Sequence, residues 1–148
     1  MNELIIKEIK ELIENSNNVA LFTHTNCDCD GIGSMCALYE YIQEKNKNAD
    51  MFCDSYIPEK YYFLKYCNRI NIVEFKNDKY DLLISLDTAT ADKLGEYGAD
   101  FTQFKNTINI DHHVSNSEYA KINYVIPNYS SCGEVMYDIL KGFGEPIT

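Results

Sequence analysis

Three apolar, strand-like runs in this chain each end directly in side chains that commonly bind metal ions. The runs are residues 19–23, 82–86 and 107–110, which lead into His24, Asp87 and the triplet Asp111-His112-His113. Apolar runs without polar alternation are typical of strands buried on both faces of a parallel sheet. Imidazole and ionised carboxylate groups are common ligands of catalytic divalent metals. The pattern therefore predicts a parallel sheet with metal ligands gathered at the carboxyl ends of its strands.

The segments between these runs predict helices that alternate with the strands. Helices are expected at about 3–15, 33–45 and 132–141, shorter helical segments from Pro58 through Lys65 and up to Gly95, and further strands at 50–53 and 122–126. Ser34 is expected to cap the helix at 33–45, and Pro146 to begin one more helix. Such alternation indicates an α/β fold, a mostly parallel β-sheet flanked by helices on both faces.

The chain is long enough for one domain with a substantial core, and it is acidic. Its 148 residues carry a net charge of −10, whereas proteins that track along nucleic acid present a basic stripe. Small phosphorylated substrates stay open, because bound metals reverse the local charge. With six cysteines and neither a membrane span nor a signal peptide expected, the sequence predicts a cytoplasmic protein with reduced thiols and no membrane partner. The 12 tyrosines are interpreted as packing residues rather than base-stacking platforms.

The candidate ligands are spaced as a site for two metal ions requires. Asp28 and Asp30 lie two residues apart in a loop after His24, so that their side chains are expected to diverge and serve different ions. Asp87, from another strand, is expected to bridge the two ions, which lie about 3.5–4 Å apart in such sites. His112 is then expected to bind the second ion.

More ordinary roles exist for each of these residues taken singly. An aspartate at a strand end more often caps a turn or a helix, and Asp111 has the alternative of orienting an imidazole. All three histidines of the chain, however, fall in these clusters. The combination predicts metal-assisted phosphoester hydrolysis, with Mn²⁺ or another first-row ion favoured over Ca²⁺.

With these residues identified, the chain resembles the DHH phosphoesterase superfamily, and most closely its nanoRNase branch of bifunctional oligoribonucleases and pAp phosphatases. The resemblance covers nearly the whole chain and rests on the segments His24-x-Asn26-x-Asp28-x-Asp30-Gly31-x-Gly33-Ser34, Ser85-Leu86-Asp87-Thr88, Asp111-His112-His113 with Asn116, and Ser131-Cys132-Gly133-Glu134. Cys27, Cys29 and Cys132 replace the family's common Pro, Gly and Thr, and none of these changes removes a ligand.

The resemblance implies a role for each matching residue. One Mn²⁺ would be bound by His24, Asp28 and Asp87, and the other by Asp30, Asp87 and His112. His113 would lie near the scissile phosphate as a catalytic residue, with Asp111 supporting the histidines. Asn26 and Ser131 would contact the substrate's phosphate groups.

The function implied by the resemblance is Mn²⁺-dependent hydrolysis of short oligonucleotides or of 3′-phosphoadenosine 5′-phosphate, by attack of a metal-bound hydroxide. Other members of the superfamily remain alternatives: a cyclic-dinucleotide phosphodiesterase, an exopolyphosphatase or a pyrophosphatase. The continuation Gly31-Ile32-Gly33-Ser34 favours the nanoRNase branch over the pyrophosphatase. A non-catalytic metal- or nucleotide-binding module is the alternative from a different class.

Two family features do not occur in the chain. No Asp-Thr-Gly segment follows the helix at 132–141, and the smaller C-terminal substrate-binding domain is absent. Residues 1–148 are therefore expected to form a DHH catalytic domain that is incomplete at its C-terminus, and to be weakly active or inactive alone. An exposed sheet edge would favour self-association, for instance as a homodimer.

Overall fold

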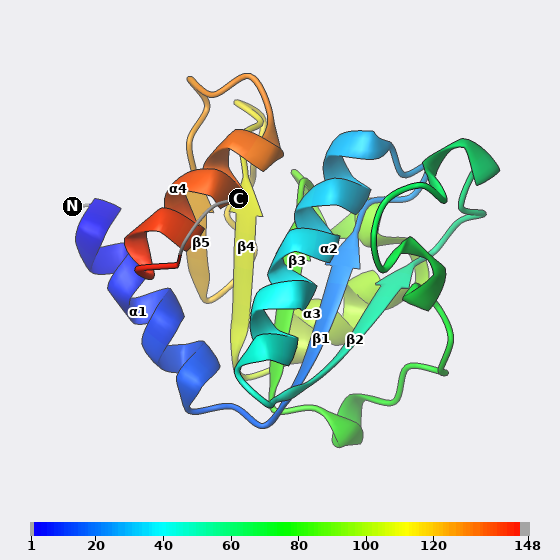
Figure 1. The fold of residues 1–148 in the computed structure, drawn as a ribbon, viewed down its shortest axis with the longest axis horizontal. Helices are drawn as coiled ribbons and strands as arrows, with labels where there is room; N and C mark the ends of the chain where they lie inside the picture. Colours follow the sequence, from blue (N-terminus) through cyan, green and yellow to red (C-terminus); the bar gives the residue numbers. More distant parts are fainter. Residues whose placement is uncertain (1, 146–148) are drawn as a thin grey trace.

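A five-stranded parallel sheet forms the centre of the structure, a computed structural model that describes residues 2–145 (Figure 1). Its strands are β1 (Asn18–Thr23), β2 (Asn48–Cys53), β3 (Leu82–Leu86), β4 (Thr107–Asp111) and β5 (Ile122–Val125). They lie in the order β2-β1-β3-β4-β5, and every neighbouring pair is parallel. The carboxyl ends of all five strands therefore meet at one edge of the sheet.

Helices cover both faces of this sheet, as predicted from the alternating pattern (Figure 1). One face carries α1 (Asn2–Glu14), α2 (Cys29–Glu44) and α4 (Cys132–Gly142). The opposite face carries the shorter α3 (Gly98–Gln103), which follows a 3₁₀ segment, Ala91–Tyr97. The predicted α/β fold is confirmed. Within residues 2–145, no helix is both long and apolar enough to cross a membrane.

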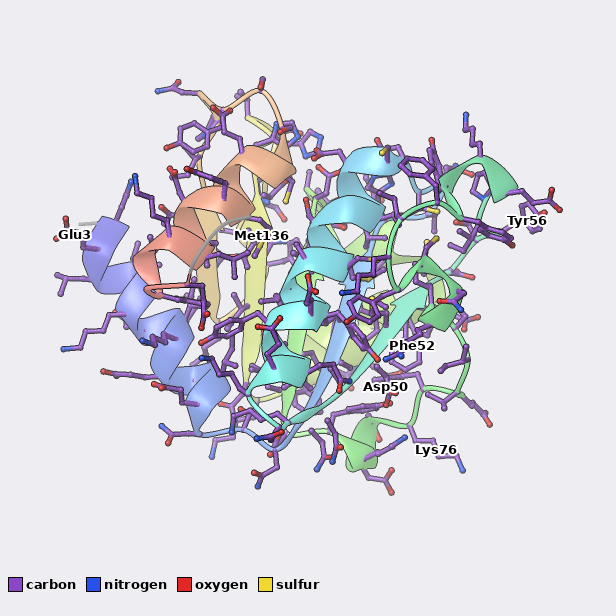
Figure 2. All side chains as sticks on the ribbon, in the orientation of Figure 1. Glu3, Asp50, Phe52, Tyr56, Lys76 and Met136 are labelled. Carbon is purple, nitrogen blue, oxygen red and sulfur yellow. The ribbon has the colours of Figure 1, made fainter. Side chains whose placement is uncertain are left out.

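Two apolar layers, one on each face, hold the helices to the sheet. Leu21 and Met136 belong to the layer beneath α1, α2 and α4, whereas the next strand residue, Phe22, belongs to the layer beneath α3 (Figure 2). Phe22 packs on Phe52 at a centroid distance of 5.5 Å, and both rings are fully buried. Each such side chain contributes about 1.5–3 kcal/mol to folding. Both faces of the strands are thus covered, which explains why the sequence runs are continuously apolar.

Helix α2 begins earlier than the sequence predicted, because its cap is Asp28 and not Ser34. The Asp28 carboxylate accepts a hydrogen bond from the backbone N–H of Gly31 at 2.9 Å. Ser34 lies inside the helix, and its buried hydroxyl has no hydrogen-bond partner among residues 2–145. The expectation that Ser34 caps the helix was wrong, since Asp28, six residues upstream, supplies the capping acceptor.

The helix predicted from Pro58 through Lys65 was also wrong. Only the single 3₁₀ turn Glu59–Tyr61 forms there, and Tyr66 takes a left-handed conformation with φ of 73°. Tyr62 and Phe63 are exposed, so the segment lacks a buried apolar face that would hold a longer helix. The sequence missed α3, and Pro146 lies outside the described residues.

The arrangement of the strands places a crevice at the candidate ligands. From β1 the chain continues to β2 on one side, while β3 lies on the other side of β1. Such a reversal of strand order opens a binding crevice beyond the carboxyl ends of the strands. His24 directly follows β1 and Asp87 directly follows β3, so both residues emerge at this point.

Candidate metal centre

Asp87 lies at the centre of the site. Its side chain is buried, with Oδ2 3.4 Å from Nε2 of His24 and Oδ1 3.2 Å from Nε2 of His112. Within residues 2–145, Oδ1 has no hydrogen-bond partner of acceptable geometry. A buried carboxylate oxygen without a partner is costly unless a cation neutralises it.

The two neighbouring imidazoles are oriented as metal ligands. The Nδ1 atom of His24 lies 2.7 Å from the carbonyl oxygen of Thr25, and Nδ1 of His112 lies 3.2 Å from that of Tyr129. A carbonyl only accepts hydrogen bonds, so each Nδ1 carries the proton that it donates, and each ring turns its Nε2 towards Asp87. Backbone carbonyls orient histidine ligands in this way, with the other ring nitrogen directed at the metal position.

The side chains form two groups that share Asp87. Ligand atoms of His24, Asp28 and Asp87 all lie within 4.8 Å of one another. The same limit holds for the second group, which consists of Asp87, Asp111, His112 and His113. A carboxylate shared between two groups of nitrogen and oxygen donors fits a pair of divalent first-row ions.

Asp30 approaches the second group but is also held by helix α4. Its Oδ2 atom lies 3.5 Å from Nε2 of His112. Its two oxygens also accept hydrogen bonds from the backbone N–H groups of Cys132 and Gly133, each at 2.9 Å. The N-terminus of α4 thus stabilises the charged form and fixes the direction of Asp30. Its role as a metal ligand remains a prediction.

His113 belongs to the second group and also lines a hollow of about 190 Å³. Its Nδ1 atom donates to Oδ1 of Asp111 at 2.6 Å, and Asp111 is fully buried. The other carboxylate oxygen of Asp111 accepts from Nδ2 of Asn116 at 2.8 Å. Asp111 is therefore placed to fix the His113 ring, leaving Nε2 of His113 free for a ligand in the hollow.

The electrostatics of the site favour a cation. The pKa of His24 is raised to about 9, chiefly by its interaction with the Asp87 carboxylate and against the opposing effect of burial. Burial raises the pKa of Asp87, an effect that His24 opposes and that Asp30 and Asp28 reinforce. Several carboxylates thus compete for positive charge in one small volume, which a bound divalent ion would supply.

A buried polar network ties the turn after Asp87 to the segment after β4. The side-chain amide of Asn109 donates to the Ser85 hydroxyl at 2.8 Å and to the Thr88 carbonyl at 3.2 Å. The hydroxyl of Tyr119 also donates to the Thr88 carbonyl, at 3.0 Å. Asn116 links this network to Asp111, because its amide donates to the Asn109 side-chain oxygen at 2.7 Å. Asp87 itself has a φ of 59°, a strained value for a non-glycine residue, which these bonds help to hold.

Replacing Tyr119 with phenylalanine is expected to weaken Mn²⁺ binding about tenfold, since loss of a group that orients metal ligands typically costs 10–100-fold in affinity. Burial raises the pKa of the Tyr119 hydroxyl, so it stays protonated as a donor. Calorimetric titration with Mn²⁺ measures the change. Tyr124→Phe is the matched control, because Tyr124 is a buried tyrosine whose hydroxyl makes no hydrogen bond within the described part of the chain. Equal affinities of the two variants would contradict the role of the network.

Two predicted residues are not brought to the cluster. Asn26 is exposed and makes no side-chain hydrogen bond within residues 2–145. Ser131 caps helix α4, and its hydroxyl accepts from the backbone N–H of Glu134 at 3.1 Å. Neither lines the hollow beside His113. That Asn26 and Ser131 contact phosphate remains a prediction.

The sequence interpretation missed three residues of the site region. Asn109 and Tyr119 belong to the buried network, and Lys93 lines the hollow. Asn109 offered a signal, because an amide in the middle of an apolar strand requires buried partners. No pattern in the sequence distinguished Lys93 or Tyr119 as residues of the site.

Comparison with known proteins agrees with this geometry. Residues 18–147 match the DHH family, N-terminal domain. The bifunctional oligoribonuclease and PAP phosphatase NrnA of Bacillus subtilis (strain 168) is 25% identical over 134 residues, which are 89% of this chain and 41% of that protein. The chain therefore spans less than half the length of this curated relative.

Solved structures share the fold. An exopolyphosphatase-related protein from Bacteroides fragilis superposes with a TM-score of 0.89 at 20% identity, over 96% of this chain and 44% of that one. Exonuclease RecJ bound to manganese superposes with a TM-score of 0.53 at 11% identity, over 98% of this chain and 38% of that one. The family match spans nearly all of the residues, and the resemblance found in the sequence is thereby confirmed: this chain belongs to the DHH family, of which it forms the N-terminal domain.

Proposed function

We propose that this chain is the metal-binding catalytic domain of a phosphoesterase that hydrolyses short oligonucleotides, 3′-phosphoadenosine 5′-phosphate or both. The observation that carries the proposal is the buried Asp87 carboxylate, which lies between the Nε2 atoms of two histidines that follow β1 and β4, the strands on either side of β3. The similarity to the B. subtilis bifunctional oligoribonuclease and PAP phosphatase supports the choice of substrate.

The cofactor we propose is a pair of divalent ions, with Mn²⁺ favoured by the nitrogen and oxygen donors. His24, Asp28 and Asp87 would hold one ion, and Asp87, His112 and Asp30 the other. When bound, such ions supply Lewis-acid charge at the phosphoryl oxygens and lower the pKa of water. The similarity to manganese-bound RecJ is one of fold and is consistent with this choice.

The protein's own groups would position the substrate. His113 lines the hollow, and the bond from Nδ1 to Asp111 fixes the plane of the ring. From this position His113 would contact a phosphoryl oxygen of a substrate held at the ions. Asp111 would act through His113, because it is fully buried and reaches no solvent. Holding the reacting groups in place in this way accounts for much of the rate in enzymes of this type.

The proposal also concerns the parts of the enzyme beyond this domain. Because the chain spans 41% of the B. subtilis relative, we propose that much of the substrate selection lies in residues outside it. Self-association through a sheet edge remains a prediction that sedimentation analysis would test.

The first test is calorimetric titration of the protein with Mn²⁺, compared with its His24→Ala variant. We expect the parent to bind Mn²⁺ and the variant to lose roughly 10–100-fold or more in affinity at one site, because a ligand is removed outright. Asp78→Ala is the control, since Asp78 is an exposed carboxylate remote in the fold from the cluster.

A panel of substrates then separates this function from its alternatives, and it is run on the full natural chain loaded with Mn²⁺. Dinucleotides, 3′-phosphoadenosine 5′-phosphate, cyclic dinucleotides, polyphosphate and pyrophosphate are compared by kcat/KM. Preference for the first two supports the proposal. Preference for one of the others assigns a different reaction to the same site, and Mn²⁺ binding without any hydrolysis identifies a binding module.

A further inference from the structure

Lys93 is the one lysine among the side chains that line the hollow beside the metal cluster, and no arginine lines it. The lining consists of His24, Asp28, Asp87, Ala89, Lys93, His113 and Ser115. Most of these residues belong to the candidate metal centre. Lys93 and Ser115 are polar residues of the lining to which the proposed metal site gives no role.

The backbone anchors Lys93 beside the metal ligands. Its carbonyl oxygen accepts a hydrogen bond from the N–H of Thr25 at 2.8 Å, next to His24. At the start of the same segment, the carbonyl of Ala89 accepts from the N–H of Ser117 at 3.0 Å. The segment from Ala89 to Lys93 is therefore fixed to the loops that carry both histidine clusters, and Lys93 does not sit on a free loop.

The ammonium group of Lys93 is available for a ligand. It makes no ion pair or side-chain hydrogen bond within residues 2–145, whereas Lys45, Lys65 and Lys79 are paired with carboxylates. Lys93 is exposed to solvent at the mouth of the hollow. The chain has a net charge of −10, so an unpaired lysine beside the metal ligands provides local positive charge to which an anion can bind.

The size of the hollow limits what can enter it. Its volume is about 190 Å³. Sites for whole drug-sized or nucleotide-sized ligands measure roughly 300–1,000 Å³. The hollow therefore suits a single phosphoryl group, with the nucleoside remaining outside.

We propose that Lys93, assisted by the hydroxyl of Ser115, forms the subsite that binds the non-bridging oxygens of the substrate's phosphoryl group. The ammonium group of Lys93 donates to these oxygens, while His113, which follows β4, contacts the same phosphoryl group. The inference rests on the proposed phosphoesterase function and adds the groups that hold the reacting phosphate.

The experiment measures inorganic phosphate binding by calorimetry on the full natural chain loaded with Mn²⁺. Lys93→Ala is expected to weaken phosphate binding roughly tenfold, as loss of a charge-assisted hydrogen bond does. Lys93→Arg is expected to restore most of the affinity, because the charge and the donors return. Lys105→Ala is the matched control, since Lys105 is an exposed lysine at the amino end of β4, at the opposite edge of the sheet.

The same variants are assayed for Mn²⁺ affinity and for hydrolysis of a dinucleotide. Unchanged Mn²⁺ affinity with weaker phosphate binding supports the subsite. If Lys93→Ala binds phosphate as tightly as the parent, the subsite is wrong even where the parent hydrolyses its substrate. A Lys93-dependent phosphate site in a parent that hydrolyses none of the substrates supports the subsite and counts against the phosphoesterase function.

Discussion

The Asp87→Asn variant is expected to lose roughly 10³-fold in kcat, because metal ions supply several kcal/mol of transition-state stabilisation and about 1.36 kcal/mol corresponds to a factor of ten. Asp87 is the carboxylate common to both groups of ligands. The amide is nearly the same size, but it carries no charge and offers one oxygen. Neither ion would then be bound tightly, so the affinity for Mn²⁺ would decrease at both sites.

The measurement compares kcat and Mn²⁺ affinity of the full natural chain with those of the variant. Asp78→Asn makes the same chemical change at an exposed position and is expected to leave both unchanged. Thermal unfolding provides the second control. The substitution relieves the burial of a charge but also removes its interaction with His24, so the melting temperature of the metal-free variant is measured to separate loss of folding from loss of metal binding. A kcat within tenfold of the parent would refute the bridging role.

The sheet and the position of the site could be predicted from the sequence, because both follow from how parallel strands are buried. Strands buried on both faces must be apolar along their length, and parallel strands end at the same edge. His24, Asp87 and His112 were therefore expected to meet although they lie far apart in the chain. The structure brings their ligand atoms to within 3.2–3.4 Å of one another in pairs.

The sequence predicted helix boundaries less well where more than one residue could serve as the helix cap. Asp28 and Ser34 are both good helix caps, and the choice depended on where the backbone leaves β1. The aromatic segment after Pro58 has reasonable helix formers, but Tyr61 and Leu64 are only partly buried against the core, which is too little to hold a longer helix.

Several of the supporting groups of the site left no signal in the sequence. Tyr119 reaches Thr88 across 31 positions of the chain, and the Lys93 carbonyl is fixed by Thr25. Such bonds follow from the completed packing and leave no periodic pattern. Asp30 shows the same limit, because its bonds to the N-terminus of α4 span 102 and 103 positions.

The second large effect is expected at Gly31, where alanine should destabilise the protein by about 1–3 kcal/mol, the usual cost of overpacking. A Cβ atom at this position would clash with Oγ1 of Thr23 and would lie 3.4 Å from Oδ2 of Asp87. Thr23 cannot move away easily, because it is fully buried and its hydroxyl donates to the Leu86 carbonyl at 3.0 Å. The first turn of α2 would have to shift, and Asp28 would shift with it.

Gly33 provides the matched control within the same helix. A Cβ atom there meets nothing within 4 Å, so Gly33→Ala is expected to raise stability by up to about 1 kcal/mol through better helix propensity. Urea unfolding measures both free energies, and Mn²⁺ titration measures the effect on the site. Gly31→Ala is expected to weaken Mn²⁺ binding as well, whereas Gly33→Ala is not. Equal stability and equal Mn²⁺ affinity of the two variants would contradict this argument. The close approach of α2 to β1 and Asp87 would then not be what positions the metal ligands.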